Sequence, residues 1–240
     1  MKKRIIAIII TWGVLGGITG FTQSNRQLTQ YINQLTLKPT VANHQIYQQL
    51  QGHIQALANK QHQYKRERKF LKYLFYNTHK KFLKKYEMHQ DFSAIFGKDR
   101  KYNCVSGTTL YAIILQELGY KYSIRETAFH VYLIVHTSKY PKILLDSTDP
   151  HNGFLYNAHM IRKRERHYTE NNEYKFNQEI TLSQLIGLQY YNQGVQYFNQ
   201  KTFGKALVKL TKAYQHYPSN RVKALQELAQ NYYRLALNER

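Results

Sequence analysis

The spacing of apolar residues predicts helices over most of the chain and strands near its centre. Apolar positions recur every three or four residues over 25–37, 42–59 and 64–87, which is the period of a helix with one buried face. Apolar and β-branched residues at 128–135 and 142–146, separated by a polar turn, are typical of two strands of a hairpin. Helices around this pair of strands predict an α+β fold.

The single cysteine of the chain lies at the start of another predicted helix. Apolar residues follow it at mostly helical spacing as far as Leu118, and Gly119 is typical of the residue after a helix end. The Asn103 side chain can cap the first turn, so Cys104 is expected at or near the first helical position. Free N–H groups and the positive end of the helix dipole favour the thiolate, and the same N–H groups can hold an oxyanion.

A thiolate nucleophile needs a base and a group that orients the base. If the hairpin is symmetric about Ser138, His130 pairs with Asp146, and their Cβ atoms lie about 4.5–5.5 Å apart. We therefore predict that Asp146 holds the imidazole that serves Cys104. The alternation along the first strand places Val131, Leu133 and Val135 on one face and His130, Tyr132 and Ile134 on the other.

These features resemble the transglutaminase-like superfamily, relatives of papain-type cysteine enzymes. Cysteine opens a helix that ends in Leu-Gly-Tyr, a strand with histidine follows, and the next strand ends in Asp-Ser-Thr-Asp-Pro. The resemblance covers roughly residues 100–150. It implies a cysteine-bearing helix packed on an antiparallel sheet, with Cys104 as nucleophile, His130 as general base and acid, and Asp146 as the orienting carboxylate.

The resemblance also bears on the substrate pocket. Many family members have an aromatic residue such as Trp two positions after the histidine, where this chain has Tyr132. We expect Tyr102, Asn103 and Tyr132 to line the pocket. A second oxyanion donor is expected upstream of the cysteine, and Asn77, Gln90 and Tyr102 are candidates.

Each residue of the triad also has a structural explanation. A lone cysteine that opens a helix is commonly a small buried residue, and an aspartate before Ser-Thr is commonly a turn residue. His159 and His167 have no cysteine or acidic partner at ligand spacing, so no metal site is predicted. No phosphate-binding glycine motif is present, and the proposed chemistry requires no cofactor.

The chain is strongly basic. It has 35 Lys and Arg residues against 14 Asp and Glu, a net charge of +21. Such a surface attracts polyanions, but no nucleic-acid motif accompanies the charge, so no specific nucleic-acid site is predicted. The basic helix over 64–87 is a weaker candidate for binding anionic lipid or an acidic envelope polymer.

The N-terminus indicates export. A basic tetrapeptide precedes an apolar stretch over 5–21 and a polar segment, so residues 1–24 are predicted to be a signal peptide or a short membrane anchor. The body is then periplasmic, on the cell surface or secreted. One cysteine cannot form an intrachain disulfide, and a single thiol in an exported chain is reactive or pairs between molecules.

The C-terminal part is predicted to be helical. A tetratricopeptide-like pattern spans 187–220, with its signature residues at Tyr190, Gly194, Tyr197, Ala206, Leu210, Ala213 and Pro218. A further helix over 221–238 is expected to bury Ala224, Leu225, Leu228, Tyr232 and Leu235. One such repeat cannot bury its own face, so it should pack on the preceding domain or on a protein partner.

The domain boundaries follow from these patterns. Residues 25–180 form the predicted transglutaminase-like domain with its N-terminal helices, and 181–240 form the helical region. Residues 151–179 are polar and basic and are predicted to be a loop-rich connector that covers the site.

Two functions remain open from the sequence. The first is an exported cysteine enzyme that hydrolyses an amide bond, or transfers its acyl group, in a protein or peptide substrate. The second is a non-catalytic envelope interaction protein that uses the repeat and the basic surface and keeps the triad as a remnant.

Overall fold

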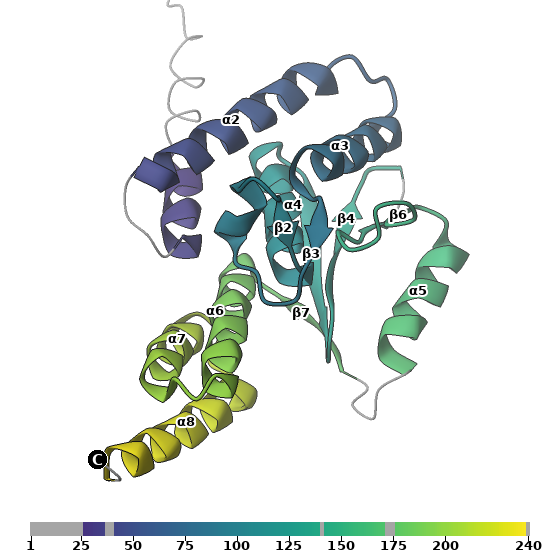
Figure 1. The fold of residues 1–240 in the computed structure, drawn as a ribbon. Coiled ribbons are helices and arrows are strands. Elements are labelled where there is room, and N and C mark those ends of the chain that lie inside the picture. Colours follow the sequence, from purple (N-terminus) through teal and green to yellow (C-terminus); the bar gives the residue numbers. More distant parts are fainter. Residues whose placement is uncertain (1–25, 37–40, 140–141, 171–175, 239–240) are drawn as a thin grey trace, which may run out of the picture.

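A five-stranded antiparallel sheet forms the centre of the molecule (Figure 1). The computed structural model describes residues 26–36, 41–139, 142–170 and 176–238. In spatial order the strands are β6 (Phe154–Leu155), β5 (Ile143–Leu145), β4 (Val131–His136), β3 (Lys121–Thr127) and β7 (Asn177–Ile180). Helices accompany the sheet, so the predicted α+β class is confirmed.

The N-terminal part is helical, as predicted, but one predicted helix is too long. The helices are residues 26–35, α2 (Val41–Gln61) and α3 (Glu67–Phe82). The predicted helix over 64–87 ends early because Leu83 adopts an extended conformation and is buried. The chain then forms β1 (Lys85–Tyr86), which pairs in parallel with β2 (Lys101–Tyr102). Tyr86, expected on the buried face of the helix, is a strand residue whose side chain is 48% exposed.

Two helices cover opposite faces of the sheet (Figure 1). The first is α4 (Cys104–Glu117), which shares a core with Val131, Leu133 and Val135 of β4. On the other face, α5 (Ala158–Glu170) packs its Ile161 against Tyr132 and Ile134. The alternation predicted for β4 is therefore confirmed.

The prediction of a loop-rich connector over 151–179 is wrong, because this segment contains β6, α5 and the first part of β7. Only two residues of α5, Ile161 and Tyr168, join the small apolar cluster on this face of the sheet. They lie seven positions apart and give the helix a narrow apolar stripe. Basic residues surround these two positions in the sequence, so the apolar spacing is too weak to predict a helix.

The C-terminal helices stack on one another and on the sheet domain. They are α6 (Leu182–Asn199), α7 (Phe203–His216) and α8 (Asn220–Asn238). Close packing of α6 on α7 depends on Gly194, since a Cβ atom there would lie 2.6 Å from a methyl carbon of Leu210. The first half of α6 belongs to the same core as α4, so the predicted packing of the helical region on the sheet domain is present.

The predicted buried side of α8 is wrong for most of its residues. Val222 and Ala229 are the buried residues of the helix, whereas Leu228 is 43%, Tyr232 46% and Leu235 58% exposed. The small Ala229 allows α8 to approach α7 closely through Ala206 and Leu210. Leu225 is partly buried against this cluster, and the half-exposed Tyr232 ring stacks on Phe203 with centroids 5.3 Å apart.

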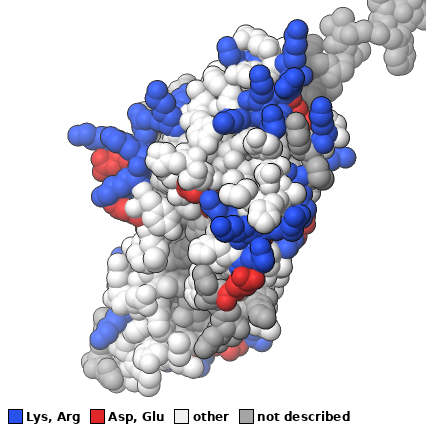
Figure 2. Space-filling view, turned by 90° about the vertical axis from the view of Figure 1, so that its right-hand side faces the viewer, with Lys and Arg blue, Asp and Glu red and all other residues white. Residues whose placement is uncertain are grey.

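The surface is basic in separate groups of side chains. Figure 2 shows Lys and Arg spread over several parts of one face, with few acidic side chains between them. The predicted signal peptide or anchor at 1–24 lies outside the described residues. Within the part of the chain that the structure describes, no helix is both long enough and apolar enough to span a bilayer.

Candidate active site

Cys104 is the first residue of α4, as predicted, and its partly buried thiol lies at the end of that helix. A reciprocal cap fixes this end. The Ser106 N–H donates to Asn103 Oδ1 (2.9 Å), and the Asn103 N–H donates to Ser106 Oγ (3.0 Å). The Asn103 amide also donates to the carbonyls of Met88 and Gln90, each at 2.9 Å. Asn103 is thus a buried structural cap, and its predicted role in lining the pocket stays a prediction.

The first turn of α4 lies directly against the segment that follows β5. A Cβ atom on Gly107 would lie 2.6 Å from Ser147 Oγ and 2.8 Å from Ser147 Cβ, closer than side-chain atoms approach in folded proteins. Ser147 follows Asp146 in the chain, and both are buried. Glycine at position 107 therefore brings the cysteine end of α4 close to the carboxylate.

We expect Gly107→Ala to lower the free energy of unfolding by about 1–3 kcal/mol, because the added methyl group overpacks a buried contact. Urea unfolding measures this change. The matched control is Gly52→Ala in α2, where a Cβ atom meets nothing within 4 Å. It should instead stabilise the protein by about 1 kcal/mol through helix propensity. Equal effects of the two changes would contradict the close approach at Gly107.

The predicted hairpin register is wrong, yet His130 and Asp146 still meet. The observed pairs of β4 and β5 are Leu133 with Leu145 and Val135 with Ile143, so the ladder is centred on residue 139. Burial of both pairs on the α4 side fixes this register. Continuing it places position 146 diagonally from position 130 on one face, within reach of an imidazole. The His130 Nε2 lies 3.2 Å from Asp146 Oδ1.

A tight turn between β3 and β4 holds His130. The Thr127 N–H donates to the His130 carbonyl (2.8 Å), and the His130 N–H donates to Thr127 Oγ1 (3.1 Å). The imidazole lies on the rings of Tyr132 and Tyr168, with ring centroids 6.3 Å and 4.7 Å away. Tyr132 is fully buried beside the imidazole and supports His130, and its predicted role in the pocket stays a prediction.

Four donors from two segments surround the Asp146 carboxylate. Oδ1 accepts from the N–H and the hydroxyl of Thr148 at 2.9 and 2.7 Å. Oδ2 accepts from the Tyr168 hydroxyl, and Arg164 Nη1 lies 3.5 Å from it. Tyr168 and Arg164 belong to α5, and sequence reasoning missed both. Their spacing of four residues on one helix is the signal that the sequence did carry.

These contacts set the charges of the pair. Burial alone would lower the pKa of His130, but the contacts with Asp146 and Cys104 outweigh it and raise that pKa to about 9. Burial alone would raise the pKa of Asp146, but His130, Tyr168 and Thr148 together hold it well below its usual range. The His130–Asp146 contact is not well aligned for a hydrogen bond, so we describe it as an ion pair. Because Nε2 faces the carboxylate, Nδ1 is the nitrogen left for the thiol.

Tyr86 is a further group at the thiol. It lies beside Cys104, and burial, together with the nearby Cys104, raises the pKa of the Tyr86 hydroxyl to about 12. The strand β1 positions it beside Tyr102, whose ring lies edge-on to it at 5.7 Å. Sequence reasoning did not single out Tyr86 because the spacing of apolar residues assigned it to α3.

The donors predicted from the sequence lie elsewhere. Gln90 donates its side-chain N–H to Glu87 (2.9 Å), and the buried Tyr102 hydroxyl lies 3.4 Å from His79 Nε2. Both side chains have these partners, and the predicted role of Tyr102 in the pocket stays a prediction. Asn77, on α3, stays a prediction.

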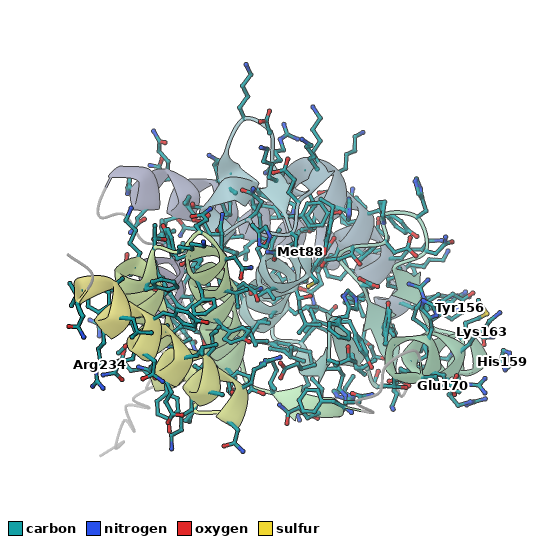
Figure 3. The ribbon with its side chains drawn as sticks, turned by 60° about the horizontal axis from the view of Figure 1, so that its bottom comes forward. Met88, Tyr156, His159, Lys163, Glu170 and Arg234 are labelled. Atoms are coloured by element: carbon teal, nitrogen blue, oxygen red, sulfur yellow. The ribbon has the colours of Figure 1, made fainter. Side chains whose placement is uncertain are left out.

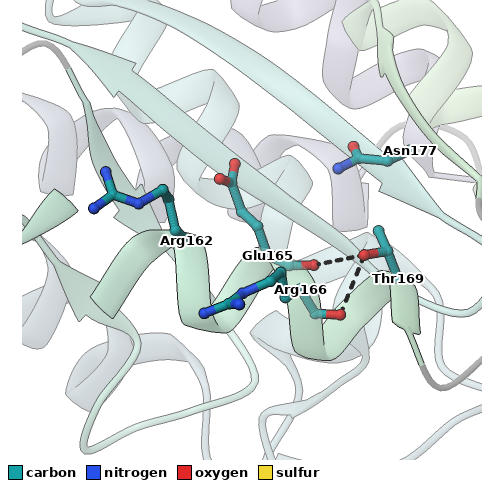
Figure 4. Close-up of a pocket in the computed structure, with 5 residues that line it drawn as sticks. All are labelled: Arg162, Glu165, Arg166, Thr169 and Asn177. Atoms are coloured by element: carbon teal, nitrogen blue, oxygen red, sulfur yellow. Dashed lines mark hydrogen bonds between the residues drawn. The ribbon is translucent and has the colours of Figure 1, made fainter. Parts of the chain in front are cut away.

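A separate hollow of about 390 Å³ lies between α5 and the start of β7 (Figure 4). It is lined by Arg162, Glu165, Arg166, Thr169 and Asn177. The hydroxyl of Thr169 donates to carbonyls of its own helix, at Glu165 and Arg166 (Figure 4). None of the three triad residues reaches this hollow.

The structure thus brings Cys104, His130 and Asp146 together, with Tyr86 beside the thiol. The resemblance to the transglutaminase-like superfamily remains a prediction, and the functional assignment depends on the site geometry. Comparisons of the chain with protein-family models, curated proteins and solved structures found no match.

Proposed function

We propose that this chain is a transglutaminase-like cysteine enzyme that acts on an amide bond of a protein or peptide. One observation carries the proposal: the His130 imidazole interacts with the Cys104 thiol and also with the buried Asp146 carboxylate. A structural cysteine requires neither a histidine nor an oriented carboxylate. A nucleophilic cysteine requires both.

The geometry supports the following steps. The thiolate attacks the amide carbonyl, forming the S–C bond, and the carbonyl oxygen becomes an oxyanion. When the C–N bond breaks, the imidazolium of His130 donates its proton to the leaving amine and a thioester remains. Next, His130 removes a proton from water or from a second amine, which attacks the thioester. The S–C bond breaks, and the thiol is regenerated.

Two kinds of donor are available for the oxyanion. The cap occupies the N–H groups of Ser106 and Gly107, which leaves those of Cys104 and Val105 at the first turn of α4. The Tyr86 hydroxyl lies at the same thiol. We assign Tyr86 the place of the second donor that was expected upstream of the cysteine.

Cys104→Ala should abolish cleavage or transfer, because no other cysteine is available as the nucleophile. The measurement is release of amine from a mixed peptide library, together with incorporation of a fluorescent primary amine into casein. The free energy of unfolding should stay within about 1 kcal/mol of the wild type, as expected for a partly exposed small residue.

Two results would contradict this proposal. Activity that persists in Cys104→Ala would exclude the cysteine as nucleophile. A loss of several kcal/mol in stability would favour a core cysteine. The exported location stays a prediction from residues 1–24, and the helical region remains a candidate site for a protein partner.

A further inference from the structure

An open hollow of about 630 Å³ lies beside the turn that carries His130. Ala128 and Phe129 of that turn form one wall, and Phe176, just before β7, forms another. Tyr217 and Pro218, between α7 and α8, complete the lining. We call this space the Phe129 hollow.

The Phe129 hollow and the imidazole share one short turn. Phe129 immediately precedes His130, and its side chain is 76% exposed, the highest value among the exposed large apolar residues. The hydrogen bonds between Thr127 and His130 hold the turn, so the backbone positions of Phe129 and His130 are fixed relative to each other. The hollow and the imidazole therefore adjoin the same turn.

A second exposed apolar surface lies near the thiol. Met88 is 67% and Tyr86 48% exposed, and the Met88 carbonyl accepts from the Asn103 cap next to Cys104. In Figure 3 Met88 lies near the middle of the face that also carries the C-terminal helices. Exposed apolar side chains grouped around a reactive centre are typical of binding surfaces.

Four polar residues at the edge of the hollow, Arg221, Tyr217, Gln178 and Gln184, are paired within the protein. Arg221 binds the buried Glu126 carboxylate at 2.6 Å, and Tyr217 donates to it at 2.7 Å. Gln178 donates to the same carboxylate (3.0 Å), and Gln184 accepts from the Thr181 N–H (2.8 Å). The charge of Arg221 is thus compensated, and the lining offers an apolar contact surface in place of a charged one.

Given the proposed function, on which this inference rests, we propose that the Phe129 hollow binds an apolar side chain of the peptide substrate. The reacting amide then lies over Cys104, with the apolar side chain against Phe129 and Phe176. The substrate class is a peptide or protein amide with a large apolar residue near the reacting group.

Alkylation of Cys104 by two reagents tests this inference. Iodoacetamide and N-(3-phenylpropyl)iodoacetamide both lose iodide to the thiolate as the S–C bond forms, but only the second carries an apolar group. The ratio of their rates, measured in the same variant, cancels any change in the reactivity of the thiol. Phe129→Ser and Phe176→Ser should each lower this ratio about tenfold, and the apolar reagent should show saturation in the wild type.

Val208→Ser is the matched control, because Val208 is 59% exposed on α7 and is not part of the hollow. It should leave the ratio unchanged. The inference is overturned if the ratio is the same in the wild type, Phe129→Ser and Phe176→Ser. This holds also when fast alkylation by iodoacetamide shows that the thiol is activated. An ordinary, slow thiol would refute the proposed function, while the ratio would still report on the hollow.

Discussion

His130→Ala should slow the alkylation of Cys104 by iodoacetamide at pH 6 by about tenfold or more. An ordinary thiol is only about 0.3% ionised at this pH. With its pKa raised to about 9, His130 is an imidazolium at pH 6 and stabilises a neighbouring thiolate. His130→Ala removes the positive charge beside the sulfur, so the alkylation rate should fall.

The pH profile separates this effect from a general loss of structure. In the wild type the rate should stay high well below pH 8, whereas in His130→Ala it should rise with pH as for an ordinary thiol. His136→Ala is the matched control, since His136 is an exposed histidine at the end of the same strand. A wild-type profile that already follows an ordinary thiol would favour the non-catalytic interaction protein.

The position of Cys104 could be predicted because its causes are local. Asn103, the apolar positions that follow and Gly119 define both ends of α4 within seventeen residues of sequence. Gly119 adopts a φ of +76°, which a glycine permits at little cost. No long-range contact is needed to place the cysteine at the first turn.

His130 lies beside Asp146 although the predicted register of the hairpin is wrong, and there is a physical reason for this. The predicted and observed ladders differ by two positions, and side chains alternate with a period of two. A shift of two positions keeps both residues on the same face. The imidazole is long enough to span the diagonal distance between the two positions. A shift of one would have separated them.

The rest of the site depends on contacts that local sequence does not encode. Arg164 and Tyr168 reach Asp146 only because α5 packs across the sheet, and that packing depends on a narrow apolar stripe. Tyr86 reaches the thiol through a parallel pair of strands only two residues long. The exposed residues of α8 follow from the small Ala229, which brings the helix close to α7 on that side.

Asp146→Asn should lower the free energy of unfolding by about 3–5 kcal/mol, because it removes one partner from a buried ion pair. The side chain of Asp146 is 3% exposed and meets both His130 and Arg164. Asparagine keeps the shape and the acceptor for Thr148, but it leaves His130 without a carboxylate and leaves Arg164 with Asp149 alone. Urea unfolding at pH 6 measures the loss. The same variant should slow alkylation of Cys104, since the imidazole loses its orienting group.

The pH dependence of stability identifies the origin of that loss. The pKa of His130 is raised in the folded state, so its contribution is complete below about pH 6.5 and is lost as the pH rises through about 9. The pKa of Asp146 is lowered, so its contribution is present above about pH 4 and is lost as the pH falls further. The contribution of this pair to the stability of the wild type should therefore be largest between about pH 4 and 6.5. In Asp146→Asn, the loss of stability below about pH 4 that Asp146 causes should be absent, and the loss between about pH 6.5 and 9 should be smaller.

Asp149→Asn is the matched control for this experiment. Asp149 is a neighbouring carboxylate that also binds Arg164, at 3.0 Å, but its side chain is 27% exposed. Asparagine retains the Oδ1 that accepts from the N–H groups of His151 and Asn152. Asp149→Asn should therefore lower the free energy of unfolding by at most about 1 kcal/mol, as for other ion pairs in contact with solvent. If the two variants lose equal stability and keep equal pH profiles, Asp146 is an ordinary turn residue and does not orient His130.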